Sequence, residues 1–296
     1  MKRSAFFAVV FSLVLVSVST VRATDDVERA IHLFRSHQYE EAKVLFEKIL
    51  GTDDNNAEIH YYLGRTYLIL GDHDKAVDHC ERAVELRGDV ADYHFWLAQS
   101  YGVKAMNANM FAKASLASKI REAYEKTVEL DSTHIQGRVG LINFYLQAPS
   151  FMGGGVDKAR AQVEMLIQLD EKRGRAVLAQ IYVREDKLDL AEAEYKWLEE
   201  EYGDSQDSYS FYNNEYGYFL LNQKRYDEAI EKFEKQVALA PDHANAYDSL
   251  GDGYRAAGRL EDAADAYRKA LEIDPHFAAS KKNLEKVEKE MVSQTK

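Results

Sequence analysis

Apolar residues recur every three or four positions along most of the chain, with charged residues between them. The segment 244–275 reads ANAYDSLGDGYRAAGRLEDAADAYRKALEIDP, and a shift of about 34 residues brings back the same skeleton. An internal repeat of this length predicts stacked pairs of amphipathic helices rather than one large globular core.

One small residue marks each repeat, and the residue four positions later is usually large. The first set of positions holds Ala42, Ala76, Ile120, Ala159, Ala191, Ala229 and Ala263, of which only Ile120 is not small, and the later positions hold Phe46, Cys80, Tyr124, Val163, Tyr195, Phe233 and Tyr267. A small residue lets two helices approach closely, and a large one fills the space between neighbouring pairs. This spacing predicts a repeat region at 24–275 with hairpins near 24–56, 57–90, 91–134, 135–171, 172–205, 210–243 and 244–277. A capping helix is expected in 276–296.

This skeleton resembles the tetratricopeptide repeat, a helix-turn-helix unit. Gly251, Tyr254, Ala263, Tyr267 and Ala270 stand at positions that define the family. The resemblance implies an all-α, right-handed superhelical solenoid of about seven hairpins. It also implies that the first helix of each hairpin lines a concave groove that binds a peptide or protein segment.

Residues 1–23 have the pattern of an export signal. Lys2 and Arg3 precede an apolar run from Ala5 to Val18, and Val21-Arg22-Ala23 has small residues where signal peptidase cuts. The pattern predicts cleavage after Ala23 and a periplasmic or secreted protein. An uncleaved anchor is the alternative, because Ala5 to Val21 is 17 residues, which is at the lower limit for spanning a bilayer. No second such run follows, so we expect no stable membrane insertion after cleavage.

Charge and composition narrow the function classes. The chain has 50 acidic and 38 basic residues, a net charge of −12, which disfavours nucleic acid as a partner and favours proteins with basic stretches. Acids at helical spacing, such as Asp189, Glu192, Glu194 and Glu199, are interpreted as a solvated face.

The sequence has no hydrolase, nucleotide-loop or dinucleotide motif. We therefore expect no enzyme activity, no catalytic residue and no cofactor.

A metal site is also not expected. Cys80 is the single cysteine, so neither an intrachain disulfide nor a multi-cysteine zinc site can form. His73 and His79 lie near it in sequence, but helical geometry does not bring the three side chains together. Cys80 occupies a core position and is expected to be buried and inert.

The family's groove positions supply a candidate partner-binding surface. They hold Tyr61, Arg65, Phe95, Gln99, Asn143, Arg184, Phe211, Asn214, Tyr218 and Arg255. The four aromatic residues are interpreted as anchors for a peptide; the alternative is that some only pack against the next hairpin. The Lys–Asn carboxylate clamp known from the family is absent, because Tyr61 and Arg65 stand at one such pair of positions.

Two insertions, at 102–119 and 148–157, interrupt the repeat and resemble a subgroup of secreted bacterial tetratricopeptide proteins. Both are expected in inter-helix turns of neighbouring hairpins and therefore side by side on one edge. This inserted edge contains Met106, Met110, Phe111, Phe151, Gly153, Gly154 and Gly155. The glycine N–H groups are candidates for holding an anion. The alternative is a tight exposed turn with Phe151 and Met152 tucked under it.

These observations favour an exported, non-catalytic scaffold that binds a peptide or protein segment in its groove. Two alternatives remain. One is a small-molecule or glycan binder at the inserted edge. The other is a structural solenoid that self-associates weakly through its terminal hairpins, because no separate cap precedes the first one.

Overall fold

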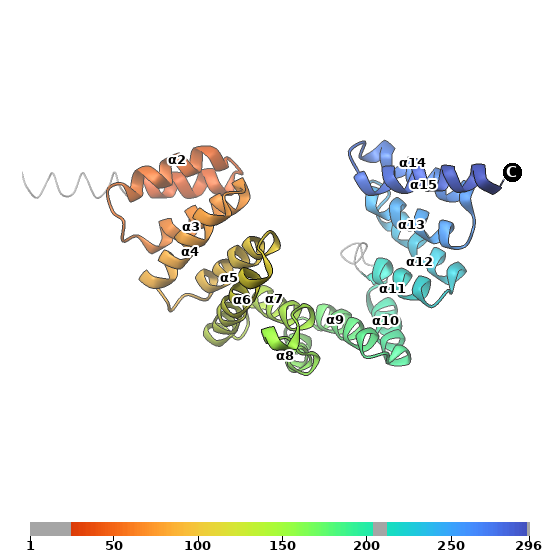
Figure 1. The fold of residues 1–296 in the computed structure, drawn as a ribbon, viewed down its shortest axis with the longest axis horizontal. Helices are drawn as coiled ribbons and strands as arrows, with labels where there is room; N and C mark the ends of the chain where they lie inside the picture. Colours follow the sequence, from red (N-terminus) through yellow and green to blue (C-terminus); the bar gives the residue numbers. More distant parts are fainter. Residues whose placement is uncertain (1–24, 204–211, 295–296) are drawn as a thin grey trace, which may run out of the picture. The chain divides into compact units, whose positions relative to one another are not determined.

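A computed structural model describes residues 25–203 and 212–294, and within these ranges the chain forms helices and no β-strand (Figure 1). The expected signal peptide, 1–23, lies outside the described residues. After a helix at 25–35, the helices of the first half are α2 (Tyr39–Leu50), α3 (Ala57–Leu70), α4 (His73–Leu86), α5 (Ala91–Met106), α6 (Met110–Leu130), α7 (Ile135–Gln147), the 3₁₀ helix η1 (Ser150–Met152) and α8 (Val156–Leu169). Those of the second half are α9 (Glu171–Arg184), α10 (Leu188–Tyr202), α11 (Tyr212–Asn222), α12 (Tyr226–Leu239), α13 (Ala244–Ala256), α14 (Leu260–Ile273) and α15 (Ala278–Gln294).

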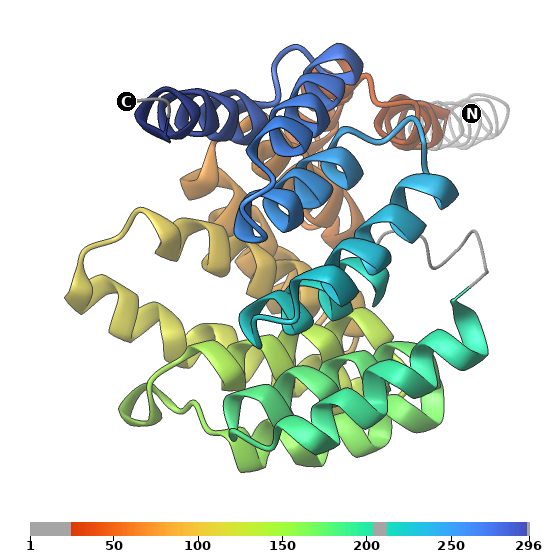
Figure 2. The same ribbon diagram turned by 90° about the vertical axis from the view of Figure 1, so that its right-hand side faces the viewer.

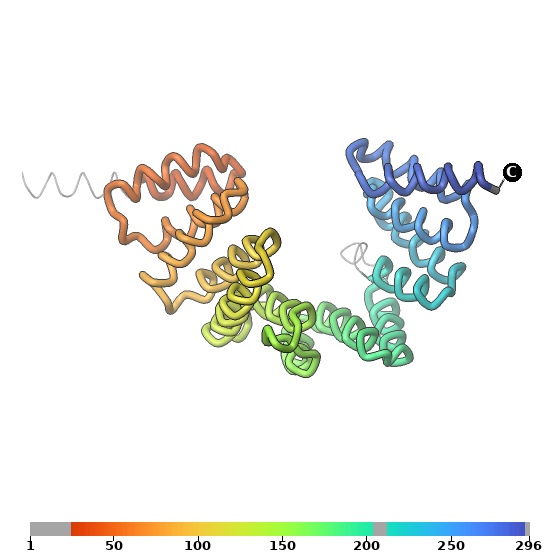
Figure 3. The backbone as a smooth tube through the Cα atoms, viewed as in Figure 1, coloured from red at the N-terminus to blue at the C-terminus, as the bar shows by residue number. Residues whose placement is uncertain are grey.

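The chain divides into two compact units, Met1–Leu169 (unit 1) and Asp170–Lys296 (unit 2). In unit 1 each helix from α2 to α8 packs against the next, and α3 also contacts α5. In unit 2 the same holds from α9 to α15, and α13 contacts both α11 and α15. Contacts between every second helix mean that hairpins are stacked within each unit, as the tube of Figure 3 lets the reader follow. The expected all-α repeat fold is confirmed.

The small residue of each repeat is buried at the contact between its two helices. Ala42, Ala76, Ala159, Ala191, Ala229 and Ala263 have no exposed surface; only Ile120 is partly exposed. The large residues four positions later are all buried. A Cβ atom on Gly251 would lie 2.6 Å from the ring of Tyr267, so this hairpin is as closely packed as the repeat pattern predicts.

Ala263→Leu tests this register. Extra methyl groups at a fully buried alanine force neighbouring side chains apart, and we expect a loss of about 1–3 kcal/mol in the free energy of unfolding. Ala279→Leu is the matched control, because Ala279 is exposed on α15. Urea unfolding followed by circular dichroism measures both variants. Equal stability of the Ala263→Leu variant and the natural chain would contradict the register.

A ladder of tyrosine–glutamate hydrogen bonds joins neighbouring hairpins. In each rung a tyrosine of a first helix donates to a glutamate 20 residues earlier, on the second helix of the preceding hairpin. The pairs are Tyr67–Glu47, Tyr101–Glu81, Tyr145–Glu125 and Tyr254–Glu234. Burial raises the pKa of all four hydroxyls, that of Tyr254 to about 12, so each stays a donor at neutral pH.

The two insertions take different forms. The first was expected to enlarge a turn, but it instead lengthens α5 to 16 residues and α6 to 21, with only 107–109 between them. The reason is composition: this segment is rich in alanine, lysine and methionine, which favour helix. The second insertion forms a loop that contains η1. Because η1 contacts α6, the two insertions are neighbours as expected, and Figure 2 shows both on the same side of unit 1.

Candidate functional site

The residues at the family's groove positions lie on the first helices of the hairpins. In unit 1 these are the helix at 25–35, α3, α5 and α7, and we call their side-chain surface the A-helix face of unit 1. In unit 2 the corresponding helices are α9, α11, α13 and α15. The two faces differ in chemistry, and each is described by itself.

Arg65 is the central cation of the A-helix face of unit 1. Its guanidinium carbon lies 4.3 Å from the ring centre of Trp96, 4.7 Å from that of Phe34 and 5.0 Å from that of Tyr61. The ring of Tyr62 is 5.7 Å away. Three first helices thus contribute to one aromatic niche, and cation–π attraction of about 0.5–2 kcal/mol per contact holds the guanidinium in it.

The guanidinium of Arg65 does not use all of its N–H donors within the chain. Nη1 donates to the hydroxyl of Tyr61 at 2.7 Å, whereas Nε is buried without an acceptor. Within the described residues Arg65 forms no ion pair with a carboxylate, although acids exceed bases in this chain. A fixed, incompletely paired guanidinium is suited to a carboxylate supplied by another molecule.

Two aromatic residues predicted as anchors are mostly covered. Tyr61 is 8% exposed and stacks on Tyr93, with ring centres 4.9 Å apart; Phe95 is 6% exposed. Burial raises the pKa of Tyr61 to about 12. The two rings offer little surface to a partner, so their burial favours the packing alternative; they form the walls around Arg65 and His134.

Acidic groups flank the niche. The amide of Gly137 donates to Nδ1 of His134 at 2.9 Å, so the neutral imidazole carries its proton on Nε2 and donates it to Asp92 at 3.0 Å. The Asp92 side chain is 59% exposed, and Glu58 on α3 is exposed as well. The A-helix face of unit 1 therefore presents one cation between two accessible carboxylates.

In unit 2 the predicted groove residues are engaged by side chains of neighbouring helices. Ser249 donates to Asn214 at 2.8 Å, and Tyr218 donates to Asp252 at 2.9 Å. Arg255 pairs with Glu290 of α15 at 2.5 Å. These bonds connect α11, α13 and α15, so Asn214, Tyr218 and Arg255 stabilise the stack, and a partner would have to displace them.

The remaining predicted groove residues are scattered. Gln99 is partly buried on α5, and Asn143 is exposed on α7. Arg184, at the end of α9, is exposed but interacts within the chain. Phe211 lies outside the described residues. Of the ten predicted residues, Arg65 is the one whose surroundings define a site.

The glycine turn of the inserted edge does not offer free N–H groups. Gly153 donates to Ser150 at 3.0 Å, Gly154 to Pro149 at 3.1 Å and Gly155 to Tyr145 at 2.8 Å. The candidate anion site in this turn is therefore not supported, because backbone carbonyls already accept from its N–H groups, and the tight exposed turn is the arrangement that forms. Phe151 is not tucked under the turn either: it is 80% exposed.

Cys80 is a buried thiol, as predicted. It is 1% exposed, and burial raises its pKa to about 11. Nδ1 of His79 instead lies 2.9 Å from Nδ1 of His60, a partly buried pairing that the sequence did not indicate. Across residues 25–203 and 212–294, no group of three or more His, Cys, Asp or Glu could hold a metal ion.

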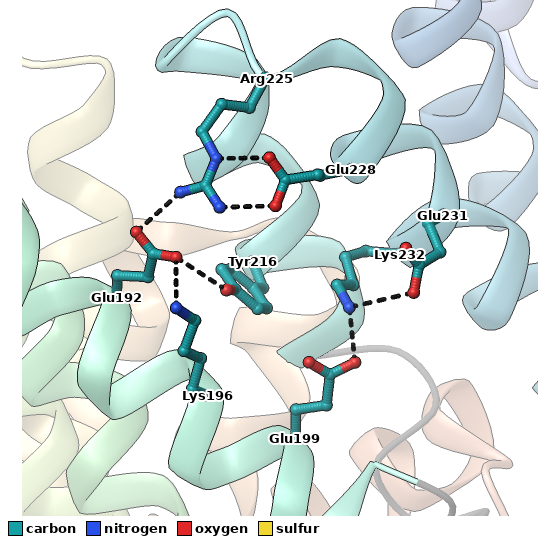
Figure 4. Close-up of polar contacts among 8 residues, drawn as sticks. All are labelled: Glu192, Lys196, Glu199, Tyr216, Arg225, Glu228, Glu231 and Lys232. Carbon is teal, nitrogen blue, oxygen red and sulfur yellow. Dashed lines mark hydrogen bonds and ion pairs between the residues drawn. The ribbon is translucent and has the colours of Figure 1, made fainter.

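A charged network between α10 and α12 was also missed (Figure 4). Glu192 accepts from Arg225 at 2.7 Å and from Lys196 at 2.9 Å, and Tyr216 donates to it at 3.4 Å. Hydrogen bonding to Arg225 lowers the pKa of Glu192 to about 2. The interpretation of these acids as a solvated face is wrong for Glu192, Glu194 and Glu199, whose side chains are only 15–25% exposed. Lys196 lies on the same helix, but the other cationic partners, Arg175, Arg225 and Lys232, come from outside α10, which helical spacing along one segment does not reveal.

Stacked hairpins and buried repeat alanines define a helical repeat protein. Models of the tetratricopeptide repeat family match residues 33–99 and 207–276. The chain is a tetratricopeptide-repeat protein. Within the described residues no helix is both long and apolar enough to cross a membrane.

The similar proteins match this chain at low sequence identity. Superkiller complex protein 3 of Mus musculus is 23% identical over 254 residues, which cover 84% of this chain but 13% of that protein. The chloroplastic tetratricopeptide repeat domain-containing protein PYG7 of Arabidopsis thaliana is 23% identical over 195 residues, covering 62% of this chain and 63% of that protein. The chain thus spans about an eighth of the length of the mammalian relative.

Solved structures show the same fold. A tetratricopeptide repeat protein from Parabacteroides merdae superposes with a TM-score of 0.68 at 15% identity, over 90% of this chain and 98% of that one. The APC/C hetero-tetramer Cut9-Hcn1 gives a TM-score of 0.56 at 13% identity, over 87% of this chain and 48% of that one. Proteins of this family and fold are typically non-catalytic and mediate protein–protein interactions.

Proposed function

We propose that this protein is an exported, non-catalytic scaffold that binds a segment of a protein partner on the A-helix face of unit 1. The observation that carries the proposal is Arg65, a cation fixed by four aromatic rings and left without a carboxylate partner. A charge held in this way is preorganised, so little conformational entropy is lost when a ligand binds.

The partner segment has mixed charge. An acidic side chain or a C-terminal carboxylate pairs with Arg65 through two parallel hydrogen bonds, which its planar guanidinium favours. Basic residues on either side face Glu58 and Asp92, both exposed. The excess of acidic residues in the whole chain attracts the basic part of such a segment and accelerates encounter.

The same proposal includes export and the absence of catalysis. Export is supported by the basic start, apolar run and small-residue cleavage site of residues 1–23. Non-catalysis is supported by the usual role of the family and by the lack of catalytic motifs. The intact mass of the protein recovered outside the cytoplasm tests export: a chain beginning at Thr24 is expected, and an unprocessed cytoplasmic chain would contradict it.

Substitution at Arg65 tests the site. Peptides selected from a random phage library on the natural protein are expected to share an acidic residue. Arg65→Gln should weaken their binding by about tenfold to a hundredfold, because it removes one partner of a largely desolvated charge pair. Arg65→Lys keeps the charge but loses the bidentate geometry, so an intermediate loss is expected.

Arg82→Gln is the control for that experiment. Arg82 lies on α4, a second helix, where it pairs with Glu85 and Asn55. Fluorescence anisotropy gives the affinities, and circular dichroism shows whether each variant keeps its helical content. Unchanged affinity in the Arg65→Gln variant, or an equal loss in Arg82→Gln, would refute the site.

Weak self-association is a second candidate function, favoured by Val44, which is 63% exposed on the outer helix α2 of the first hairpin. Sizing chromatography over a concentration series distinguishes it from the scaffold role. Elution at the volume of a monomer at every concentration would exclude self-association.

A further inference from the structure

The most exposed large apolar side chains of the described residues gather on the inserted edge. Phe111 is 89% exposed, Phe151 80%, Met106 74% and Met110 69%. Elsewhere such residues occur singly, and the next most exposed is Val44 at 63%. Apolar side chains held in water at neighbouring positions indicate a surface that contacts something else.

These four side chains occupy two neighbouring projections of unit 1. Met106, Met110 and Phe111 lie at the tip of the α5–α6 hairpin, and Phe151 lies in η1, which contacts α6. Figure 2 shows the tip and the η1 loop on the same side of unit 1. Gly153 packs beside Arg121, ten residues along α6 from Phe111, so about 15 Å of helix separates the two apolar groups. Two separated projections fit an extended surface better than one small ligand.

The charge of this edge differs from that of the chain as a whole. No acidic residue occurs between Asp92 and Glu122, or between Asp131 and Asp157, although the chain has 50 acids. At the tip, exposed Lys113 forms no ion pair within the described residues. Asp72 and Asp74 border the α5–α6 turn, but each is paired with a lysine, Lys75 or Lys104. The charge left unpaired beside the exposed apolar side chains is therefore that of Lys113.

We propose that the inserted edge rests on the surface of a phospholipid bilayer. Phe111, Phe151 and the two methionines enter the boundary between headgroups and acyl chains, and Lys113 reaches the phosphates. The unpaired Lys113 beside these apolar side chains matches an anionic lipid surface in charge, and the Asp74 carboxylate next to the α5–α6 turn is already paired with Lys104 at 2.7 Å. The contact is peripheral and leaves the A-helix face to a different partner.

Flotation with vesicles of phosphatidylethanolamine and phosphatidylglycerol tests the proposal. The full chain is purified after export, and its intact mass records whether residues 1–23 remain. The natural protein is expected to float with the vesicles. Phe111→Ser with Phe151→Ser should lower the bound fraction by about tenfold or more, because the residues that enter the membrane are lost. Val44→Ser with Leu190→Ser, which also removes exposed apolar side chains, should bind like the natural protein.

Three results would overturn the proposal. The first is a natural protein that stays with the buffer. The second is vesicle binding by the Phe111/Phe151 double variant that equals that of the natural protein. This result would assign membrane contact to another segment, such as residues 5–21 in a chain that was not cleaved. The third is a natural protein that elutes as a dimer and becomes monomeric only in the Phe111/Phe151 double variant, which would make the edge a contact between copies.

Discussion

Replacing Gly154 by alanine is expected to open the 148–155 loop and to lower the free energy of unfolding by about 3 kcal/mol. A Cβ atom at this position would lie 1.7 Å from the carbonyl oxygen of Ala148 and 3.2 Å from that of Tyr145. Both are backbone atoms, so no side-chain rotation relieves the clash. The loop must move, and the hydrogen bonds from Gly154 to Pro149 and from Gly155 to Tyr145 break.

The neighbouring glycine provides the control. A Cβ on Gly155 would approach nothing nearer than 3.9 Å, the side chain of Lys158, so Gly155→Ala should be close to neutral. Urea unfolding measures both stabilities, and trypsin cleavage at Lys158 reports whether the loop has opened. If Gly154→Ala were as stable in urea and as resistant to trypsin as Gly155→Ala, the loop would not have this backbone arrangement.

Glu192→Gln should destabilise unit 2 by about 2 kcal/mol at neutral pH. Glu192 receives hydrogen bonds from Arg225, Lys196 and Tyr216 across three helices, and its side chain is 20% exposed. A neutral amide cannot form ion pairs with Arg225 and Lys196, and these two cations then remain close to each other. Glu231→Gln is the matched control, because Glu231 is 72% exposed and only flanks Lys232.

The same pair of variants has a distinct pH dependence. The pKa of Glu192 falls from 4.5 to about 2 on folding, so its stabilising contribution is complete above pH 4.5 and is lost as the pH falls toward 2. Between pH 5 and pH 3 the natural protein should therefore lose about 2 kcal/mol more stability than Glu192→Gln does. Parallel stability curves for the two proteins over this range would contradict the network.

The repeat alanines explain why the fold could be predicted from the sequence. Ala42, Ala229 and Ala263 recur with large residues four positions later, and both sets are determined by local helix–helix packing. The tyrosine–glutamate ladder also has a sequence signal, because each pair is 20 residues apart.

The candidate site could be predicted only in part. Arg65 stood at a groove position, but its niche depends on Phe34 and Trp96 from neighbouring hairpins, which periodicity cannot bring into contact. The same limit applies to Glu192 and Arg225. The candidate anion site in the glycine turn failed for another reason. Three glycines indicate an unusual backbone, but only the three-dimensional structure shows that the carbonyls of Ser150, Pro149 and Tyr145 accept the glycine N–H groups.

Site-specific photo-crosslinking tests the central claim most directly. A benzoylphenylalanine at Glu58, exposed on α3 and one turn before Tyr61, is introduced into the protein in its native host and irradiated. The same residue at Glu85, exposed on α4, is the control for the outer helices. We expect one discrete protein adduct from position 58 that disappears when Arg65→Gln is added, and none from position 85. An adduct from position 58 that is unaffected by Arg65→Gln, or adducts only from position 85, would contradict binding of a partner at the A-helix face of unit 1.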